Sequence, residues 1–158
     1  MNGEPGSFAD RGRGRVLALD LGQRRIGVAY SDSGRMLASP WGVVERSGNV
    51  GRDHAAVAAA VEEVGAVVVV VGLPLSLSGA RGPAAQAAAA EVEELRAVLE
   101  PTGVRVETAD ERFTTVEAQR SLTAAGRKKG AARSVIDSAA AMVLLQGWLD
   151  RTEGKEQG

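Results

Sequence analysis

The sequence predicts an α/β fold built on a five-stranded mixed sheet with helices on both faces. Three segments with a strand-like pattern, 15–21, 25–31 and 36–46, follow one another with short turns between them. Two more, 67–71 and 104–108, each follow a stretch with helical spacing. Because strand–helix–strand connections are right-handed and make their strands parallel, we expect strands one, four and five to be parallel. Strands one to three should be antiparallel.

The first strand carries a carboxylate, Asp20, among apolar residues. Leucines fill one face of the strand, while Val16 and Ala18 share the other face with Asp20, as expected of a central strand covered on both sides. An unpaired charge there is costly. Asp20 is therefore held by a cation, or lies at the exposed strand end where it caps a turn or holds a ligand. Gly22 favours a ligand, because a residue without a side chain lets the backbone come close to one.

The next two strands complete an antiparallel meander. Residues 25–31 alternate larger apolar and small side chains, which is typical of a half-buried strand. Asp32 to Gly34 then supply turn residues. The third strand, 36–46, should be irregular around Pro40, because proline has no backbone N–H for the sheet.

A helix and a buried strand follow. Asp53 can cap a helix that runs through 55–64. Four apolar residues at helical spacing predict its buried side: Val57, Ala60, Val61 and Val64. The unbroken valines of 67–71 predict a strand buried on both faces, as in a parallel sheet.

The second half of the chain predicts three more helices and one strand. Pro83 is suited to the start of an Ala- and Glu-rich helix that ends near Glu100. Residues 104–108 alternate and predict a less buried fifth strand. Helices at 115–125 and 134–149 should close the fold.

Composition favours a single domain. The chain has 158 residues, of which 44% are hydrophobic, enough for a real core. We expect this domain at 15–150, with flexible segments at 1–14 and 151–158. Because no segment has the pattern of a signal peptide or a membrane span, we expect a soluble cytoplasmic protein without a membrane partner. The oligomeric state is not predicted.

The absence of cysteine restricts any metal site. Without cysteine, and with His54 as the single histidine, a metal would need oxygen ligands. Mg²⁺ or Mn²⁺ is therefore favoured over zinc. His54 itself lies at a predicted helix start, where we expect a surface role without chemistry.

Acidic residues gather at one predicted edge of the sheet. In open α/β sheets, ligands bind at the carboxyl ends of the parallel strands. These ends bring together Asp20, the Gly72–Pro74 loop and the pair Asp110–Glu111. Periodicity does not choose between the members of that pair, and either one alone is more commonly a solvated strand end.

Four motifs in order carry a resemblance that spans about 15–149. They are Asp20-Leu21-Gly22-Gln23-Arg24-Arg25-Ile26-Gly27-Val28-Ala29, Val71-Gly72-Leu73-Pro74, Asp110-Glu111-Arg112-Phe113-Thr114-Thr115 and Val135-Ile136-Asp137-Ser138-Ala139-Ala140. The chain resembles the YqgF family, also called RuvX, whose members are described as pre-16S rRNA nucleases or Holliday junction resolvase-like proteins. The resemblance implies a ribonuclease H-like fold and an acidic, metal-binding catalytic triad of Asp20, Glu111 and Asp137. By itself, Asp137 is as consistent with a first-turn acid favoured by the helix dipole.

The implied activity is metal-dependent hydrolysis of phosphodiester bonds. Two Mg²⁺ or Mn²⁺ ions held by carboxylates can activate water and stabilise the charge on phosphorus. The resemblance favours processing of the 5′ end of pre-16S rRNA, with a ribosomal or processing partner possible. A four-way DNA junction is the alternative substrate, and a non-catalytic rRNA-binding assembly factor is the alternative of another class. An actin-type ATP-binding protein is disfavoured, because the chain has one Asp-x-Gly loop and room for one such domain.

Basic residues beside the predicted edge are candidates for nucleic-acid binding, together with Gly22. They are Arg24, Arg25, Arg81, Arg112, Arg127, Lys128, Lys129 and Arg133. Each cluster by itself is more often solvated loop charge, but several clusters beside carboxylates favour a phosphate track whose affinity falls as salt rises. Since aromatic residues make up 3% of the chain, recognition of strand or junction shape is favoured over base stacking.

Overall fold

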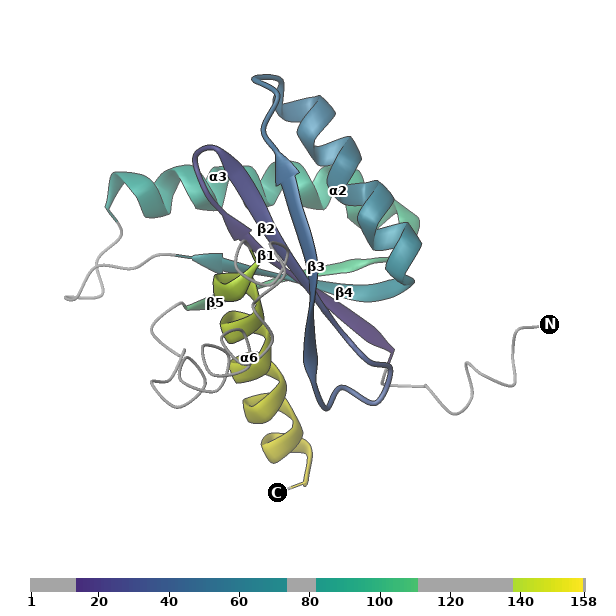
Figure 1. Cartoon of the computed structure of the whole chain (residues 1–158). Helices are drawn as coiled ribbons and strands as arrows, with labels where there is room; N and C mark the ends of the chain where they lie inside the picture. Colours follow the sequence, from purple (N-terminus) through teal and green to yellow (C-terminus); the bar gives the residue numbers. More distant parts are fainter. Residues whose placement is uncertain (1–13, 74–81, 111–137, 158) are drawn as a thin grey trace, which may run out of the picture.

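The computed structural model describes residues 14–73, 82–110 and 138–157, which form a five-stranded sheet with helices on both faces (Figure 1). The strand order is β3-β2-β1-β4-β5. β1 pairs antiparallel with β2 and parallel with β4; β2 pairs antiparallel with β3, and β4 parallel with β5. The predicted fold class is confirmed. The strands are β1 (Arg15–Leu21), β2 (Arg25–Ser31), β3 (Ala38–Glu45), β4 (Ala66–Leu73) and β5 (Arg105–Asp110).

Helices cover the sheet in two layers. Figure 1 shows α2 (Val50–Val64) and α3 (Pro83–Leu99) on one face and α6 (Ala139–Gln157) on the other. A short 3₁₀ turn, Glu100–Thr102, follows α3. α6 continues to Gln157, past the predicted helix end at 149 and through the segment expected to be a tail. The N-terminal segment 1–13, most of the loop after β4 and the helix expected at 115–125 lie outside the described residues.

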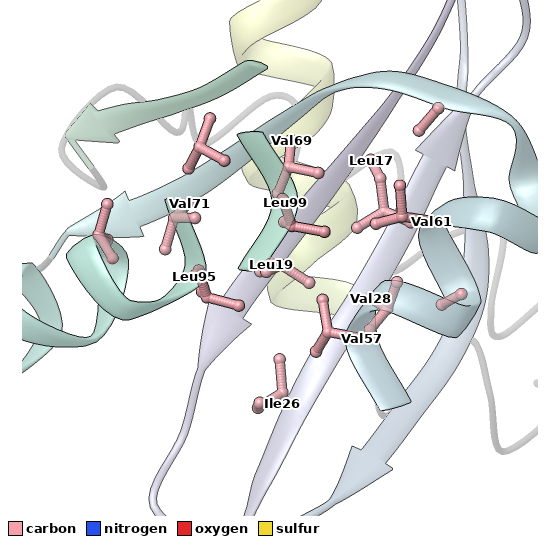
Figure 2. Close-up of a cluster of buried hydrophobic side chains, with 14 of the residues drawn as sticks. Leu17, Leu19, Ile26, Val28, Val57, Val61, Val69, Val71, Leu95 and Leu99 are labelled. Carbon is pink, nitrogen blue, oxygen red and sulfur yellow. The ribbon is translucent and has the colours of Figure 1, made fainter. Parts of the chain in front are cut away.

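The larger apolar core lies between the sheet and the pair α2 and α3 (Figure 2). The buried face predicted for α2 is confirmed, and four valines of β4 are buried, whereas Val67 is 43% exposed. β1 contributes Leu17 and Leu19, both fully buried. The side chains labelled in Figure 2 are Leu17, Leu19, Ile26, Val28, Val57, Val61, Val69, Val71, Leu95 and Leu99.

A second apolar cluster lies between the sheet and α6. Val16 and Ala18 of β1 pack there with Ala109 of β5 and with Leu145 and Trp148 of α6. β1 is therefore buried on both faces, as predicted. Because side chains alternate along a strand, Asp20 lies on the α6 face of the sheet.

The start of α2 differs from the prediction. The cap is Asn49, whose Oδ1 accepts a hydrogen bond from the Arg52 amide at 2.9 Å, and the helix begins at Val50. Asp53 lies within the first turn, where its Oδ1 accepts from the Ser47 amide and hydroxyl at 2.9 and 2.7 Å. Both residues are good caps, and the path of the chain after β3 decides between them.

The irregularity predicted in the third strand is a β-bulge. Val28 pairs with Gly42 and Ala29 with Pro40, so Trp41 is the extra residue. β3 is an edge strand, and an edge tolerates both a bulge and a proline because fewer N–H groups need partners.

Candidate active site at the carboxyl edge of the sheet

Asp20 lies close to the carboxyl end of β1, opposite Gly27 of β2. It is half-buried. The pairing of β1 with β4 reaches Leu19 and Val71, one residue before Asp20. The carboxylate is thus at the carboxyl edge of the sheet, the position predicted from the sequence.

The carboxyl ends of β4 and β5 lie at the same edge as that of β1. Gly72 pairs with Ala109 and Leu73 with Asp110. Ala109 belongs to the α6 face, which Asp20 shares, whereas Val106 packs beneath α3 on the other face. Strand alternation therefore places Asp110 on the face opposite to Asp20. The sequence pattern alone left the choice between Asp110 and Glu111 open.

α6 also approaches this edge with its first turn. Gln146, farther along the helix, donates to the Met36 carbonyl and accepts from the Ala38 amide, both at 3.0 Å. The β2–β3 connection is at the opposite edge from Asp20, so the residues that precede Gln146 in α6 lie toward the carboxyl edge (Figure 1). Ser138, just before α6, is fully buried.

The structure places four of the predicted site residues: Asp20, Gly22, Arg24 and Arg25. The others lie outside the described residues, namely Glu111, Asp137, Arg81, Arg112, Arg127, Lys128, Lys129 and Arg133.

Gly22 closes the turn between β1 and β2. Its amide donates to the Arg25 carbonyl at 3.1 Å. A Cβ atom on Gly22 would lie 2.6 Å from that same oxygen. The tight turn therefore requires glycine here, a reason distinct from the close ligand approach that the sequence favoured.

We expect Gly22→Ala to lower the free energy of unfolding by about 1–3 kcal/mol, because the added methyl group forces the turn backbone apart. Gly51→Ala is the matched control. Gly51 lies in the first turn of α2, where alanine is favoured over glycine, so that variant should be as stable as wild type or more so. Urea unfolding measures both. Equal stability of the two variants would show that the turn adapts.

An open groove of about 590 Å³ lies between the β1–β2 turn and the start of α2. Arg24 is exposed in it, and Arg25 forms a long ion pair with Glu45 at 3.8 Å. Arg24 therefore presents positive charge to solvent close to Asp20 in the chain. The lining residues are Gln23, Arg24, Arg25, Glu45, Arg46, Gly48, Val50 and Asp53.

Three residues that the sequence did not group form a polar network, and one of them, Arg46, lines this groove. Arg46 donates through Nη1 and Nη2 to the two carboxylate oxygens of Glu91, at 2.9 and 3.0 Å. Nε2 of His54 lies 2.8 Å from Glu91 Oε2. His54 is 2% exposed, so the prediction of a surface role is wrong: the histidine is buried because α3 covers it with an acidic partner. Glu91 shares a helical face with Leu95, which was the one available sequence signal.

The network and its surroundings hold two carboxylates in their charged form. Burial raises the pKa of Glu91, but the hydrogen bonds from Arg46 and His54 outweigh it and hold that pKa below its ordinary value. The Ser47 hydroxyl and amide lower the pKa of Asp53. Both carboxylates are therefore ionised in the folded protein near neutral pH.

We expect the free energy of unfolding to decrease in acid. The ordinary pKa values are 4.5 for Glu91 and 3.8 for Asp53, and folding lowers both. Such groups stabilise the fold above their unfolded pKa and lose that contribution as pH falls through the folded pKa. The free energy of unfolding measured in urea should be nearly constant down to about pH 5 and should decrease below that pH. This decrease should be shallower in Glu91→Gln than in the control Glu93→Gln, which removes an exposed acid from the same helix. Equal decreases in the two variants would contradict the role given to Glu91.

The residues present fit a hard cation at Asp20. No group of three or more Asp, Glu, His or Cys side chains that could hold a metal occurs among residues 14–73, 82–110 and 138–152. Asp20 offers carboxylate oxygen, and the single histidine, His54 of α2, is bound to Glu91 of α3. Carboxylate oxygen suits Mg²⁺ or Mn²⁺ better than zinc, so Asp20 is compatible with such an ion.

The sheet order 3-2-1-4-5, with helices on both faces, gives this protein a ribonuclease H-like fold. A family model described as "RuvX: Holliday junction resolvase" matches residues 14–151. The chain belongs to the RuvX family, as the sequence motifs implied.

Curated relatives support the family assignment. A protein of Mycolicibacterium paratuberculosis is 49% identical over 142 residues, covering 90% of this chain and 83% of the relative. A protein of Mycobacterium tuberculosis is 50% identical over 149 residues, covering 92% and 85%. Both are named "Putative pre-16S rRNA nuclease".

Solved structures support the fold. RuvC of Thermus thermophilus, in complex with a Holliday junction substrate, matches with a TM-score of 0.65 and 15% identity, covering 89% of this chain and 96% of that one. The yeast mitochondrial Holliday junction resolvase Ydc2 matches with a TM-score of 0.56 and 12% identity, covering 92% and 81%. At these identities the likeness concerns the fold.

Proposed function

We propose that this protein is a metal-dependent nuclease that processes the 5′ end of pre-16S rRNA. The observation that carries the proposal is the position of Asp20: a half-buried carboxylate at the carboxyl edge of the sheet, on the face that α6 covers. Relatives that are about half identical over nine tenths of the chain carry the name of a pre-16S rRNA nuclease.

Asp20, Glu111 and Asp137 are the proposed ligands of Mg²⁺ or Mn²⁺. The position of Asp110 on the opposite face from Asp20 favours Glu111 as the acid from the end of β5. The approach of α6 to the carboxyl edge favours Asp137, which comes two residues before Ala139 in the sequence. When bound, two such ions supply an activated water and stabilise the charge that develops on the phosphate.

The chain's own residues orient the substrate. Carboxylates that bind a metal would by themselves repel a phosphate backbone, so positive charge beside them is needed. Arg24, exposed in the groove beside the β1–β2 turn, is the described residue best placed to supply it. We propose that Gly22 and Arg25 in the same turn contribute to this track, together with Arg81, Arg112, Arg127, Lys128, Lys129 and Arg133.

A cleavage assay tests the proposal and separates its alternatives. Purified protein is incubated with Mg²⁺ or Mn²⁺ and one of three end-labelled substrates: a precursor 16S 5′ end, single-stranded RNA of equal length, or a four-way DNA junction. We expect cleavage of the precursor, abolished by a chelator and restored by excess metal. Preferred cleavage of the junction would instead support the activity that the family description names. Tight binding of the precursor without cleavage under either metal would support a non-catalytic assembly factor.

A further inference from the structure

We propose that Arg46, Glu91 and His54 form a clamp that positions the β1–β2 turn, and with it Asp20, for metal binding; the inference rests on the function proposed above. The clamp is defined by these three side chains. None of them lies on the face of the sheet that carries Asp20. Their role is therefore positioning, and they are not proposed to touch the substrate.

Arg46 binds the turn directly. Its Nε donates to the Gly22 carbonyl at 2.7 Å, and its backbone amide donates to the Arg24 carbonyl at 2.9 Å. These two carbonyls flank the tip of the turn that begins two residues after Asp20. One arginine therefore holds both sides of the turn.

The other end of Arg46 is fixed by the helical layer. Its guanidinium group donates two hydrogen bonds to the Glu91 carboxylate, and the same carboxylate is hydrogen-bonded to His54. The Arg46 and Glu91 side chains are 18% and 14% exposed, so solvent competes little for these bonds. A planar guanidinium bound at all three nitrogens has little freedom to rotate. The clamp thus connects the turn after β1 to both α2 and α3.

The position of Asp20 depends on this connection. β1 is paired with β4 up to Leu19, whereas its pairing with β2 continues through Asp20 and Leu21 to the turn. Metal ligands and catalytic groups need placement to within about 0.5 Å, and a misplacement of about 1 Å can cost about 100-fold in rate. A clamp on the turn meets that need where the β1–β4 pairing ends.

Two substitutions test the clamp without removing its bulk. Glu91→Gln replaces one carboxylate oxygen with an N–H donor that faces the Arg46 fork or His54. Arg46→Lys keeps the positive charge but removes the planar guanidinium that donates two hydrogen bonds to Glu91. Glu93→Gln, the same change at an exposed position of α3, is the matched control. Ala87→Gly in α3, which is exposed, is the control for lost helix stability alone.

Amide hydrogen exchange shows whether the clamp holds the turn, and this measurement does not depend on whether the protein cleaves RNA. We expect amides within 20–25 to exchange about tenfold faster in Glu91→Gln and Arg46→Lys than in wild type. Glu93→Gln should match wild type. Unchanged exchange in both clamp variants would overturn the proposal even if the protein cleaves RNA.

Metal affinity and kinetics show whether the held turn serves Asp20. We expect Mn²⁺ affinity, measured by calorimetric titration, to weaken about tenfold in both clamp variants. We also expect kcat to fall about tenfold while KM stays within about twofold. Equal losses in Ala87→Gly would overturn the positioning role and leave a purely structural one. If wild type binds Mn²⁺ but cleaves none of the substrates, the proposed function fails, and exchange and Mn²⁺ affinity still decide on the clamp.

Discussion

Replacing Asp20 with asparagine is expected to reduce metal-dependent cleavage by about 1,000-fold or more without unfolding the protein. A carboxylate that holds a catalytic metal supports several kcal/mol of transition-state stabilisation, and each 1.4 kcal/mol, roughly, is a factor of ten in rate. Asparagine has nearly the same shape, so the apolar cluster formed by Val16 and Ala18 under α6 should remain packed. The measurements are the initial cleavage rate at saturating Mn²⁺ and the thermal unfolding temperature.

Asp110→Asn is the matched control for Asp20→Asn. Both acids lie at the carboxyl edge of the sheet, but Asp110 is on the opposite face, in register with Leu73. Its substitution should change the cleavage rate by less than about threefold, because it is not a proposed ligand. A folded Asp20→Asn variant that cleaves at the wild-type rate would remove the basis of the proposed function. Equal losses of cleavage rate in the two variants would show that activity depends on the negative charge at this edge, and not on the face of the sheet that carries the acid.

Leu17→Ala is expected to lower the free energy of unfolding by about 3–5 kcal/mol. Leu17 is fully buried in the centre of the sheet, where β1 pairs with both β2 and β4 (Figure 2). Truncation leaves a cavity that these paired strands cannot close. Because domains of this size are stable by about 5–15 kcal/mol, the variant should still fold at low temperature.

Leu37→Ala makes the same chemical change at a position that is 67% exposed. Its effect should stay within about 0.5 kcal/mol. Urea unfolding followed by circular dichroism measures both variants, with the slope against urea checked for equality. A loss below about 1 kcal/mol for Leu17→Ala would show that β1 is not the centre of the core.

The sheet could be predicted because its signals are local. Val68 to Val71 of β4 and Leu17 and Leu19 of β1 are buried because they are apolar, and the helices between the strands set the crossovers. Pro40 marked the irregular strand for an equally local reason. The cap of α2 could not be predicted, since Asn49 and Asp53 are both suitable and the path from β3 selects the first.

The candidate site was predictable in part. Asp20 was recognisable as a charge in a buried strand. The choice between the two acids at the end of β5 needed the register of β4 with β5, which shows Asp110 on the face away from Asp20. The burial of His54 was not predictable, because its partner Glu91 is 37 residues away in the chain.

By itself, the sequence determined the order of strands and helices, the core faces of β1 and α2, and the acidic character of the sheet edge. These follow from hydrophobic periodicity and turn residues, which act over a few neighbouring positions. Only the tertiary structure decided that Gly22 is required by its own turn, that Asp110 faces away from Asp20 and that Arg46, Glu91 and His54 meet behind that turn. Strand register and contacts between distant residues depend on how the whole chain packs, so no local pattern records them.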